Sequence, residues 1–463
     1  MRGRLRGVRN ARLFLLCLPL LACVAPRSAI RPEERGPVLF TVTHPDKPGA
    51  RVSLMGTVHL ARTGYRLDRA VERTIDETEQ LFVEIDSTPE VERQLQVDAL
   101  RLGTLPEGQS VKDQLRPETW TRLQKACEQL QLDVAAVSKF KPWLLSLTLT
   151  LTAMQRANPD LRSELGLDKR VMSAMRARKK TITSLESPEF QLALLSGGDE
   201  AVQDLRLAAT LEALEKGETG RKLFDAFEAG DLGTLEQVTL QRGSMRPEHE
   251  AFMKKVWTER NLAMFDKVKA AFGSTTPQVV AVGTGHLLGD TGLVRLFEQA
   301  GYVVERVKSE GPGAEYVAPW VTESGPDFSI GFPATPMRKV VPLANGAEST
   351  LLLWQGGARA YALEVTRAPH LADVVAANGL AIFQSSVDVL AKGRTMKTSE
   401  TVTFAGRPAL HAVIEGGTPS IQLEAYVIAH GDALFSLRAV WSGDAASLPK
   451  EEFERFFKTL ELK

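Results

Sequence analysis

The strongest constraint on the fold is a local pattern that occurs twice: an apolar strand, a Gly-x-x-His motif, an amphipathic helix and a further strand. The first motif is Gly56–His59, and the second is Gly283–His286. A short apolar, β-rich run precedes each motif, and apolar residues at helical spacing follow it. Because open α/β sheets place ligands at the carboxyl ends of their strands, we expect one sheet that brings both histidines to the same edge.

The segments around the two motifs define the predicted sheet. A hairpin is predicted first, followed by a helix and four further strands, and residues 90–265 have a helical pattern almost throughout. The predicted strands are 38–42, 51–58, 81–85, 181–185, 279–282 and 302–307. The fold class we expect is therefore α+β, a mixed sheet with two strand–GxxH–helix units and a large helical insertion.

The length of 463 residues exceeds what one hydrophobic core usually organises, so two domains are expected. Residues 309–327 are broken by glycine and proline and are predicted to be a linker between a domain at 38–308 and one at 328–463. The second domain has alternating strand patterns and predicted helices near 371–392 and 447–460. We expect it to be a smaller α/β sandwich.

The N-terminus has the organisation of an export signal. Five arginines precede a short apolar run at 13–21, which ends at Leu20-Leu21-Ala22-Cys23 and resembles a bacterial lipobox. We predict a signal peptide at 1–22, lipidation of Cys23 and a polar tether at 23–37. The protein would then be attached through its lipid to the bacterial cell envelope, at the outer membrane or the periplasmic face. The alternative is an ordinary secretory signal that contains a cysteine.

The net charge and the cysteine content exclude some classes of function. Lys and Arg together number 57, as do Asp and Glu, so the formal net charge is zero and no nucleic-acid partner is expected. Of three cysteines, only Cys127 lies beyond the N-terminal region, inside a helical pattern, where we expect it to be packing rather than a nucleophile.

The motif histidines are the main candidates for chemistry. Glycine allows a sharp turn at a strand end, and the histidine three residues later can project into the crevice at the sheet edge. We expect His59 and His286 to be metal ligands, since imidazole is the commonest metal-binding side chain. Glu84, inside an apolar strand, is costly to bury unless it is paired or metal-bound, and is the expected third ligand. The alternative is an edge-strand glutamate facing water.

A metal held by these side chains would activate a bound water. Two imidazoles with a carboxylate suit Mn, Co, Zn or Fe about equally. Glu84 or Glu186, which directly follows the strand at 181–185, could act as general base. The chain contains no H-E-x-x-H motif, so it is not an ordinary zincin.

Several separated motifs resemble the TraB/GumN family, in the clan of Tiki-type proteases, erythromycin esterase and haem-binding ChaN lipoproteins. They cover roughly residues 38–308 in the family's order. They are Leu54-Met55-Gly56-Thr57-Val58-His59-Leu60, Phe82-Val83-Glu84, Leu105-Pro106-Glu107-Gly108, Lys141-Pro142-Trp143, Gly166-Leu167-Asp168, Leu185-Glu186, Glu259-Arg260-Asn261 and Val282-Gly283-Thr284-Gly285-His286-Leu287.

This resemblance implies a metal-dependent hydrolase site using His59, Glu84 and His286, and it adds Arg260 and Asn261 as site residues. Arg260 would stabilise developing negative charge. For the Tiki branch the implied reaction is hydrolysis of a peptide bond in a peptide or protein. The C-terminal domain resembles PsbP-like modules, which implies no activity.

Three alternatives to a metal-dependent peptidase remain open. One is an iron- or haem-binding lipoprotein that uses the same histidine pair. Another is a non-catalytic envelope scaffold that acts through the C-terminal domain. The last is a metal-free hydrolase in which a histidine is the general base.

Overall fold

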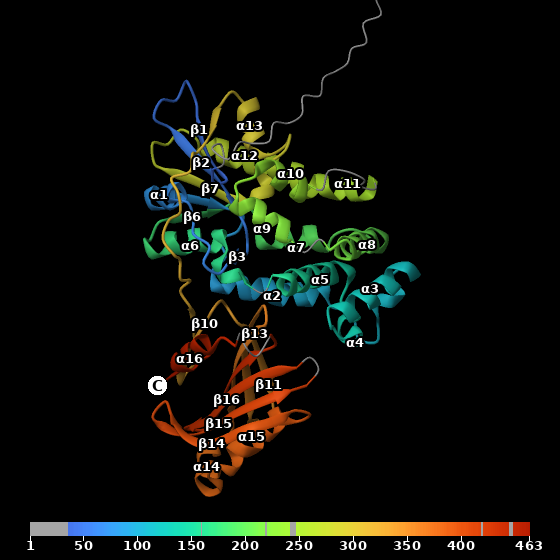
Figure 1. The fold of residues 1–463 in the computed structure, drawn as a ribbon, viewed down its shortest axis with the longest axis vertical. Coiled ribbons are helices and arrows are strands. Elements are labelled where there is room, and N and C mark those ends of the chain that lie inside the picture. The colour runs from blue at the N-terminus through green and yellow to red at the C-terminus, as the bar shows by residue number, and fades with distance from the viewer. Residues whose placement is uncertain (1–35, 159, 218–219, 241–246, 418–419, 444–447) are drawn as a thin grey trace, which may run out of the picture. The chain divides into compact units, whose positions relative to one another are not determined.

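The computed structural model describes residues 36–463 except 159, 218–219, 241–246, 418–419 and 444–447. The predicted signal peptide, Cys23 and most of the predicted tether lie outside the described residues. The described chain contains an N-terminal mixed sheet with its helices, followed by a separate antiparallel domain (Figure 1). The predicted α+β class is confirmed.

The N-terminal sheet has six strands in the order β6-β4-β7-β2-β1-β8. β6, β4, β7 and β2 run parallel to one another, whereas β1 is antiparallel to both β2 and β8. The strands are β1 (Leu39–Thr43), β2 (Arg51–Thr57), β4 (Gln80–Val83), β6 (Thr181–Ser184), β7 (Gln278–Gly283) and β8 (Val303–Arg306). The predicted hairpin is the β1–β2 pair.

The centre of the sheet follows from its sequence. β7 reads Gln-Val-Val-Ala-Val-Gly and is buried along almost its whole length, as expected for a parallel strand covered on both faces. α1 (Arg69–Glu77) and α6 (Leu167–Ala177) pack together on one side of the sheet, with α12 (Arg260–Ala271) and α13 (Leu293–Gln299) on the other (Figure 1). Asp68 caps α1 by accepting a hydrogen bond from the Ala70 N–H at 2.8 Å.

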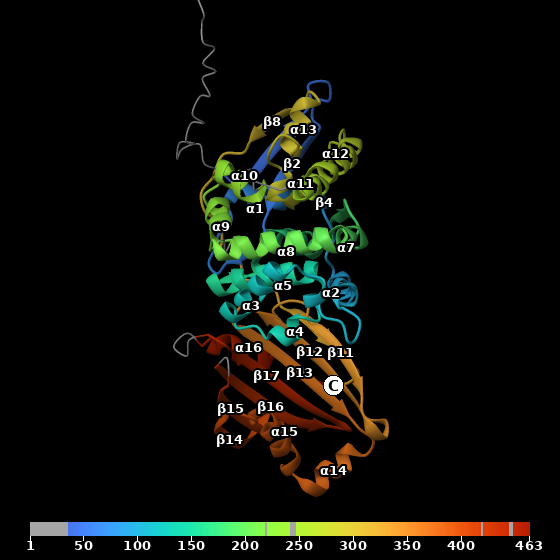
Figure 2. The same cartoon turned by 90° about the vertical axis from the view of Figure 1, so that its right-hand side faces the viewer.

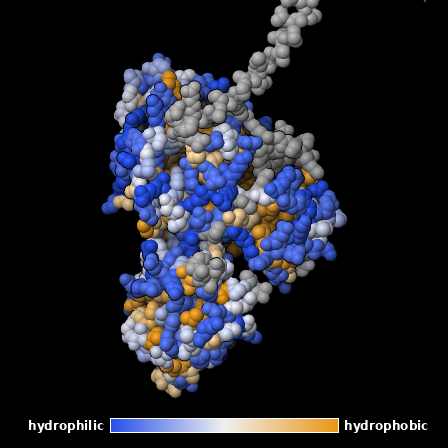
Figure 3. Space-filling view, in the orientation of Figure 1, coloured by the Kyte–Doolittle hydropathy of each residue, from blue (hydrophilic) through white to orange (hydrophobic). Residues whose placement is uncertain are grey.

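The region between β4 and β7 is helical, as predicted. Its longest helices, α2, α5 and α8, pack against neighbouring helices of the insertion. Figure 3 shows apolar surface on this insertion, where Leu147 and Leu151 of α5 are 40% and 41% exposed. The helices are α2 (Pro89–Gly103), α3 (Pro117–Gln129), α4 (Val134–Val137), α5 (Pro142–Ala157), α7 (Pro188–Ser196), α8 (Glu200–Glu215), α9 (Arg221–Glu228), α10 (Leu232–Leu240) and α11 (Pro247–Lys254). A two-stranded pair, β3 (Ala61–Arg62) and β5 (Leu161–Arg162), links the first motif to this region.

The C-terminal domain is built on a seven-stranded antiparallel sheet, ordered β11-β12-β13-β17-β16-β15-β14. One face carries an aromatic core that includes Tyr361, Phe435 and Phe456, the last from α16 (Lys450–Lys458). The opposite face is covered by α15 (Ala381–Ala391) through Phe383 and Val387 (Figure 2). The strands are β11 (Met337–Pro342), β12 (Glu348–Gly356), β13 (Arg359–Arg367), β14 (Thr395–Phe404), β15 (Arg407–Gly416), β16 (Ile421–His430) and β17 (Ala433–Trp441), with β9 (Val321–Ser324), β10 (Phe328–Phe332) and β18 (Glu461–Leu462) in a second sheet.

Two segments differ from the sequence prediction. The predicted linker 309–327 contains β9, because its backbone pairs with β10. The single helix predicted at 371–392 is two helices, α14 (Leu371–Asn378) and α15, because Gly379 adopts φ +56°, which ends the first helix. Among the described residues no single helix is long and apolar enough to cross a membrane, although α14 and α15 together, bent by 95°, meet that length and composition.

Candidate functional site

Three parallel strands end side by side at the carboxyl edge of the N-terminal sheet and carry the predicted site residues. In the strand register Val83 lies beside Ala281, and Thr57 lies beside Gly283. Glu84 directly follows β4, His286 follows β7 by three residues, and His59 follows β2 by two residues. β7 lies between β4 and β2, so the second motif is inserted between the two strands of the first unit. This strand order explains how residues far apart in sequence reach one edge.

A buried guanidinium joins two carboxylates at this edge. Arg260 donates from Nη2 to Glu84 Oε2 at 2.7 Å, and from Nε and Nη2 to the two oxygens of Glu186 at 2.8 and 2.6 Å. The three side chains are only 9%, 17% and 6% exposed, in the order Arg260, Glu84, Glu186. Two carboxylates and one guanidinium leave this cluster with a net negative charge, which favours a cationic partner.

Neutral donors complete the cluster. The Gln191 side-chain amide donates to Glu84 Oε2 at 3.1 Å and to Glu186 Oε2 at 3.0 Å, and the Gly283 N–H donates to Glu84 Oε1 at 2.8 Å. Burial alone would raise the pKa of Glu84, but the neighbouring cationic groups, with the N–H of Gly283, lower it to about 2. Glu84 is therefore ionised at neutral pH and held in one orientation.

The orientation of His286 is fixed by an amide. Asn261 donates from Nδ2 to the Thr291 carbonyl at 2.8 Å, so its Oδ1 accepts the hydrogen bond from His286 Nδ1 at 2.6 Å. Burial lowers the pKa of His286 to about 4, against the opposing charge of Glu84. At neutral pH His286 is therefore uncharged, with its proton on Nδ1 and a lone pair on Nε2.

The free nitrogen of His286 faces a carboxylate. His286 Nε2 lies 3.7 Å from Glu84 Oε1, which is beyond hydrogen-bond distance, and both atoms are acceptors in their neutral-pH states. Two facing lone pairs in a buried site repel each other unless a cation or a donating water lies between them. This gap between His286 Nε2 and Glu84 Oε1 is the most informative feature of the site.

An aromatic side chain supports His286 from the side. The Trp257 ring lies 4.9 Å from the His286 ring, and a Cβ at Gly285 would come within 2.5 Å of the indole. Glycine is therefore required at 285 for this packing. Trp257 belongs to a π-helical turn, Lys255–Glu259, directly before Arg260, and such turns are frequent at functional sites. Its indole nitrogen is buried and has no hydrogen-bond partner among the described residues.

His59 is held differently from His286. Its Nδ1 lies 2.7 Å from Asp168 Oδ2, while 77% of its side chain is exposed. Asp168 raises the pKa of His59 to about 9, and Glu84 is close enough to contribute to that shift. Gly166 allows the close approach, because a Cβ there would lie 2.5 Å from the His59 carbonyl oxygen. His59 therefore presents Nε2 to solvent at the edge of the cluster.

The structure thus places two connected groups side by side: Glu84, Glu186 and Arg260 are joined by ion pairs, and Asn261 holds His286, whose Nε2 lies 3.7 Å from Glu84. His59 lies within electrostatic range of Glu84. The sequence analysis did not select Asp168, Gln191 or Trp257. Asp168 and Trp257 stood beside or within the motifs that carried the family resemblance. No signal pointed to Gln191, which reaches the cluster only because α7 begins beside Glu186.

The donor set was compared with the requirements of a metal ion. Within the described ranges no group of three or more His, Cys, Asp or Glu side chains is gathered closely enough to hold a metal. Two donors nevertheless converge, since a cation about 2.0–2.2 Å from both an imidazole nitrogen and a carboxylate oxygen spans a gap of this size. Each motif histidine also has its Nδ1 engaged by an oxygen acceptor, the arrangement that orients metal-binding imidazoles. Glu84 and His286 therefore offer two donors of suitable type across this gap, whereas His59 is exposed and is not gathered with them.

Comparison with known proteins identifies the family of the N-terminal domain. The model of the TraB/PrgY/gumN family matches residues 38–306, more than half of the chain and the whole N-terminal sheet. The chain belongs to the TraB/PrgY/gumN family. Curated relatives include proteins named Uncharacterized protein YbaP from Shigella flexneri and from Escherichia coli (strain K12). Each is 25% identical over 254 residues, covering 54% of this chain and 89% of the relative.

Proposed function

We propose that the N-terminal domain is a hydrolase that acts on peptides or proteins with a divalent cation held by His286, Glu84 and His59. The observation that carries the proposal is the 3.7 Å gap between His286 Nε2 and Glu84 Oε1. Both groups are oriented by other side chains, and neither carries a proton toward the other near neutral pH. Preorganised lone pairs of this kind are costly unless a function uses them.

A bound divalent cation would lower the pKa of a water molecule and polarise the scissile carbonyl. The ligand types leave Mn, Co, Zn and Fe open. The chain's own residues supply orientation: Asn261 fixes the tautomer of His286, and Asp168 fixes the orientation of the His59 ring. Gln191 and the Gly283 N–H hold Glu84.

The carboxylates and the arginine divide the remaining roles. Both oxygens of Glu186 accept hydrogen bonds from Arg260, and Glu84 Oε1 borders the gap, so we propose that Glu84 serves the cation as a ligand and that neither carboxylate is free for proton transfer in this geometry. Arg260 is engaged by two carboxylates, and we propose that it positions Glu84 rather than contacting a developing oxyanion. Water exclusion is limited on the His59 side, because that ring is largely exposed.

A second candidate is supported by the two histidine pKa values. The pKa of His286 is lowered to about 4 and that of His59 is raised to about 9, so between these values one ring is a base and the other an acid. Surroundings that shift the pKa values of two neighbouring groups in opposite directions are typical of catalytic acid–base pairs. A metal-free hydrolase would use His286 as general base and His59 as general acid.

Metal analysis with matched variants tests the proposal. The purified protein is analysed by inductively coupled plasma mass spectrometry and assayed on a library of quenched fluorescent peptides. We expect a stoichiometric metal, loss of hydrolysis with a chelator, and recovery on adding Mn²⁺, Co²⁺, Zn²⁺ or Fe²⁺. His286→Ala and Glu84→Gln should lose metal and activity together. His370→Ala, at a side chain that is 84% exposed, should retain both.

Other outcomes would replace the proposal. Chelator-resistant hydrolysis without bound metal, with activity falling on both sides of a plateau between about pH 4 and 9, would establish the metal-free mechanism instead. A Soret band on adding haem, without hydrolysis, would establish haem binding. Full biological activity of the His286→Ala variant would refute any catalytic role for the cluster.

A further inference from the structure

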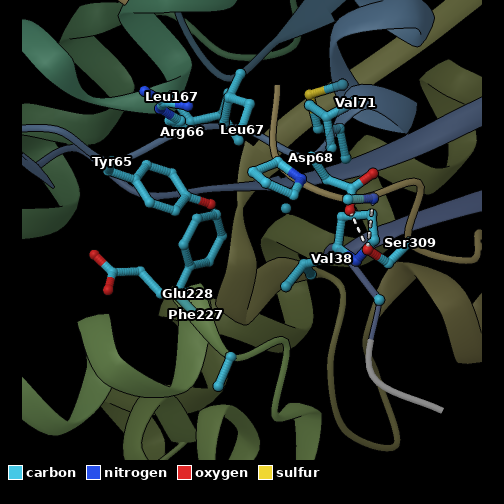
Figure 4. A pocket seen from close by; sticks show the side chains of 17 residues that line it. Val38, Tyr65, Arg66, Leu67, Asp68, Val71, Leu167, Phe227, Glu228 and Ser309 are labelled. Carbon is cyan, nitrogen blue, oxygen red and sulfur yellow. Dashed lines mark hydrogen bonds between the residues drawn. The ribbon is translucent and has the colours of Figure 1, made fainter. Parts of the chain in front are cut away.

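A cavity of about 270 Å³ lies beside the candidate site (Figure 4). Its walls include Val38 at the start of β1, Gly56 near the carboxyl end of β2 and Ser309 just after β8. The strand order places β2, β1 and β8 next to one another, while the candidate cluster lies over β4, β7 and β2. The cavity is therefore adjacent to the cluster, and the two share β2.

The cavity and the cluster also share structural elements around His59. Gly56, a wall residue, is the first residue of the motif that ends in His59. Leu167, another wall residue, donates its N–H to the carbonyl of Val58 at 3.0 Å and precedes Asp168, which binds the His59 ring. A group bound in the cavity would therefore lie close to the backbone that presents His59.

The cavity has both polar and apolar lining, and one part of it is apolar. Phe227, Leu67 and Val71 are buried wall residues, and Figure 4 shows the Phe227 ring beside the Tyr65 ring, whose centroid is 6.4 Å away. Burial raises the pKa of Tyr65 to about 12, so its hydroxyl keeps its proton and can donate a hydrogen bond. These groups suit an aromatic or long aliphatic side chain.

The two carboxylates at the walls, Asp68 and Glu228, already have partners within the protein, and Arg66 is an exposed cationic wall residue. Asp68 accepts hydrogen bonds from the N–H groups of Ala70 and Glu310 and from the Ser309 hydroxyl. Glu228 forms an ion pair with Arg62 at 2.9 Å. Because the carboxylates have partners, the cavity provides little attraction for a free cation, and burial of apolar surface is the main source of affinity.

We propose that this cavity is a specificity subsite that takes one large apolar side chain of a peptide substrate, next to the bond presented to the His59–Glu84–His286 site. The size supports a single side chain, since the cavity is smaller than the roughly 300–1,000 Å³ of pockets that enclose drug-sized ligands. The inference rests on the proposed hydrolase function for its substrate class, but the binding itself can be measured without hydrolysis.

Ala229 provides the test, because it lines the cavity at the end of α9 and is not fully buried. Ala229→Trp fills the cavity, and Ala229→Ser is the matched control. Hydrolysis is measured for peptides in which phenylalanine or alanine occupies each position flanking the cleaved bond in turn. At one position we expect wild type and Ala229→Ser to prefer phenylalanine by about 10- to 100-fold in kcat/KM, the value of burying one large apolar side chain.

In Ala229→Trp the ratio of kcat/KM for the phenylalanine peptide to kcat/KM for the alanine peptide should fall close to one. The kcat/KM of the alanine peptide itself should stay within about twofold of wild type. An unchanged preference in Ala229→Trp, or an equal loss for both peptides in a variant with wild-type circular dichroism, would overturn the subsite. Binding of N-acetyl-4-fluorophenylalanine amide, followed by ¹⁹F NMR, separates the two proposals. Saturable binding that Ala229→Trp abolishes supports the subsite even if no peptide is hydrolysed, whereas binding that Ala229→Trp leaves unchanged overturns it.

Discussion

Replacing Arg260 with methionine tests the architecture of the site most directly. Methionine keeps much of the side-chain volume but removes the charge that two buried carboxylates share. Glu84 and Glu186 would then lie close together in the protein interior without a cation. We expect the N-terminal domain to be strongly destabilised at neutral pH and to regain stability as the carboxylates take up protons.

The magnitude follows from the loss of a buried cationic partner. The pKa of Glu84 is lowered from 4.5 to about 2 by His286, Arg260 and His59 together, with His286 the largest contributor, so the shift does not measure the Arg260 pair alone. Removing one partner of a buried ion pair typically costs about 3–5 kcal/mol. Arg260 supplies only part of the shift, but its loss also affects Glu186. We therefore expect Arg260→Met to lower the free energy of unfolding by about 3–5 kcal/mol at pH 7.

The pH dependence gives a sharper criterion than the magnitude. In the wild type the folded pKa of Glu84 lies below its unfolded value, so its contribution is present above about pH 4.5 and is lost as the pH falls toward 2. In Arg260→Met burial should raise the folded pKa of Glu84, because one of its cationic partners is gone, so stability should rise as the pH falls from about 8 to 5.

Urea unfolding at several pH values between about 5 and 8, followed by far-ultraviolet circular dichroism, measures this slope. That signal reports mainly the N-terminal domain, which contains most of the helices. Arg295→Met, at an exposed i,i+3 ion pair, is the control and should change stability by less than about 0.5 kcal/mol. A variant as stable as wild type near pH 8, or one that loses stability on acidification in parallel with wild type, would refute the reasoning.

Three further substitutions test other parts of the structure. Asn261→Ala removes the acceptor that orients His286 and should weaken metal binding about 10- to 100-fold, measured by competition with a chromophoric chelator. Asp168→Asn should lower the pKa of His59 from about 9 toward 6.5, measured by NMR titration of the imidazole protons. Cys127→Ser places an unsatisfied hydroxyl at a fully buried position and should destabilise the fold by about 1–3 kcal/mol in urea unfolding, without changing turnover by active molecules.

Local patterns predicted most strands of the N-terminal sheet, because the burial of each strand is visible in the order of its own apolar and polar residues. The continuous apolar run of β7 indicates a strand covered on both faces, and the hairpin of β1 and β2 follows from turn residues between two β-rich runs. Strand order is different, since it depends on how the helical insertion folds back. No local signal shows that β7 pairs with both β2 and β4.

For the site as well, local sequence patterns predicted some residues, whereas others depend on contacts between distant parts of the chain. The two motifs predicted two histidines at one edge, and the isolated carboxylate of Glu84 predicted a buried charge with a partner. The family resemblance added Arg260 only as a group that would stabilise developing negative charge, and its pairing with Glu84 emerges from the structure, because a helix-surface arginine is ordinarily solvated. Asp168 reaches His59 through α6, and Gln191 reaches Glu84 through α7, so both contacts depend on the tertiary structure.

The equivalence of the two motifs ends at the histidines. His286 follows a central strand and enters a 3₁₀ turn, η5 (Thr284–His286), beneath Trp257, so it is buried and uncharged at neutral pH. His59 follows β2 and leads into the short strand β3, and it remains exposed beside Asp168, with a raised pKa. A repeated sequence pattern has therefore produced two imidazoles of opposite electrostatic character. That difference gives each histidine a separate role, because only His286 is deprotonated and facing Glu84 before any ligand arrives, whereas His59 must lose a proton to bind a cation.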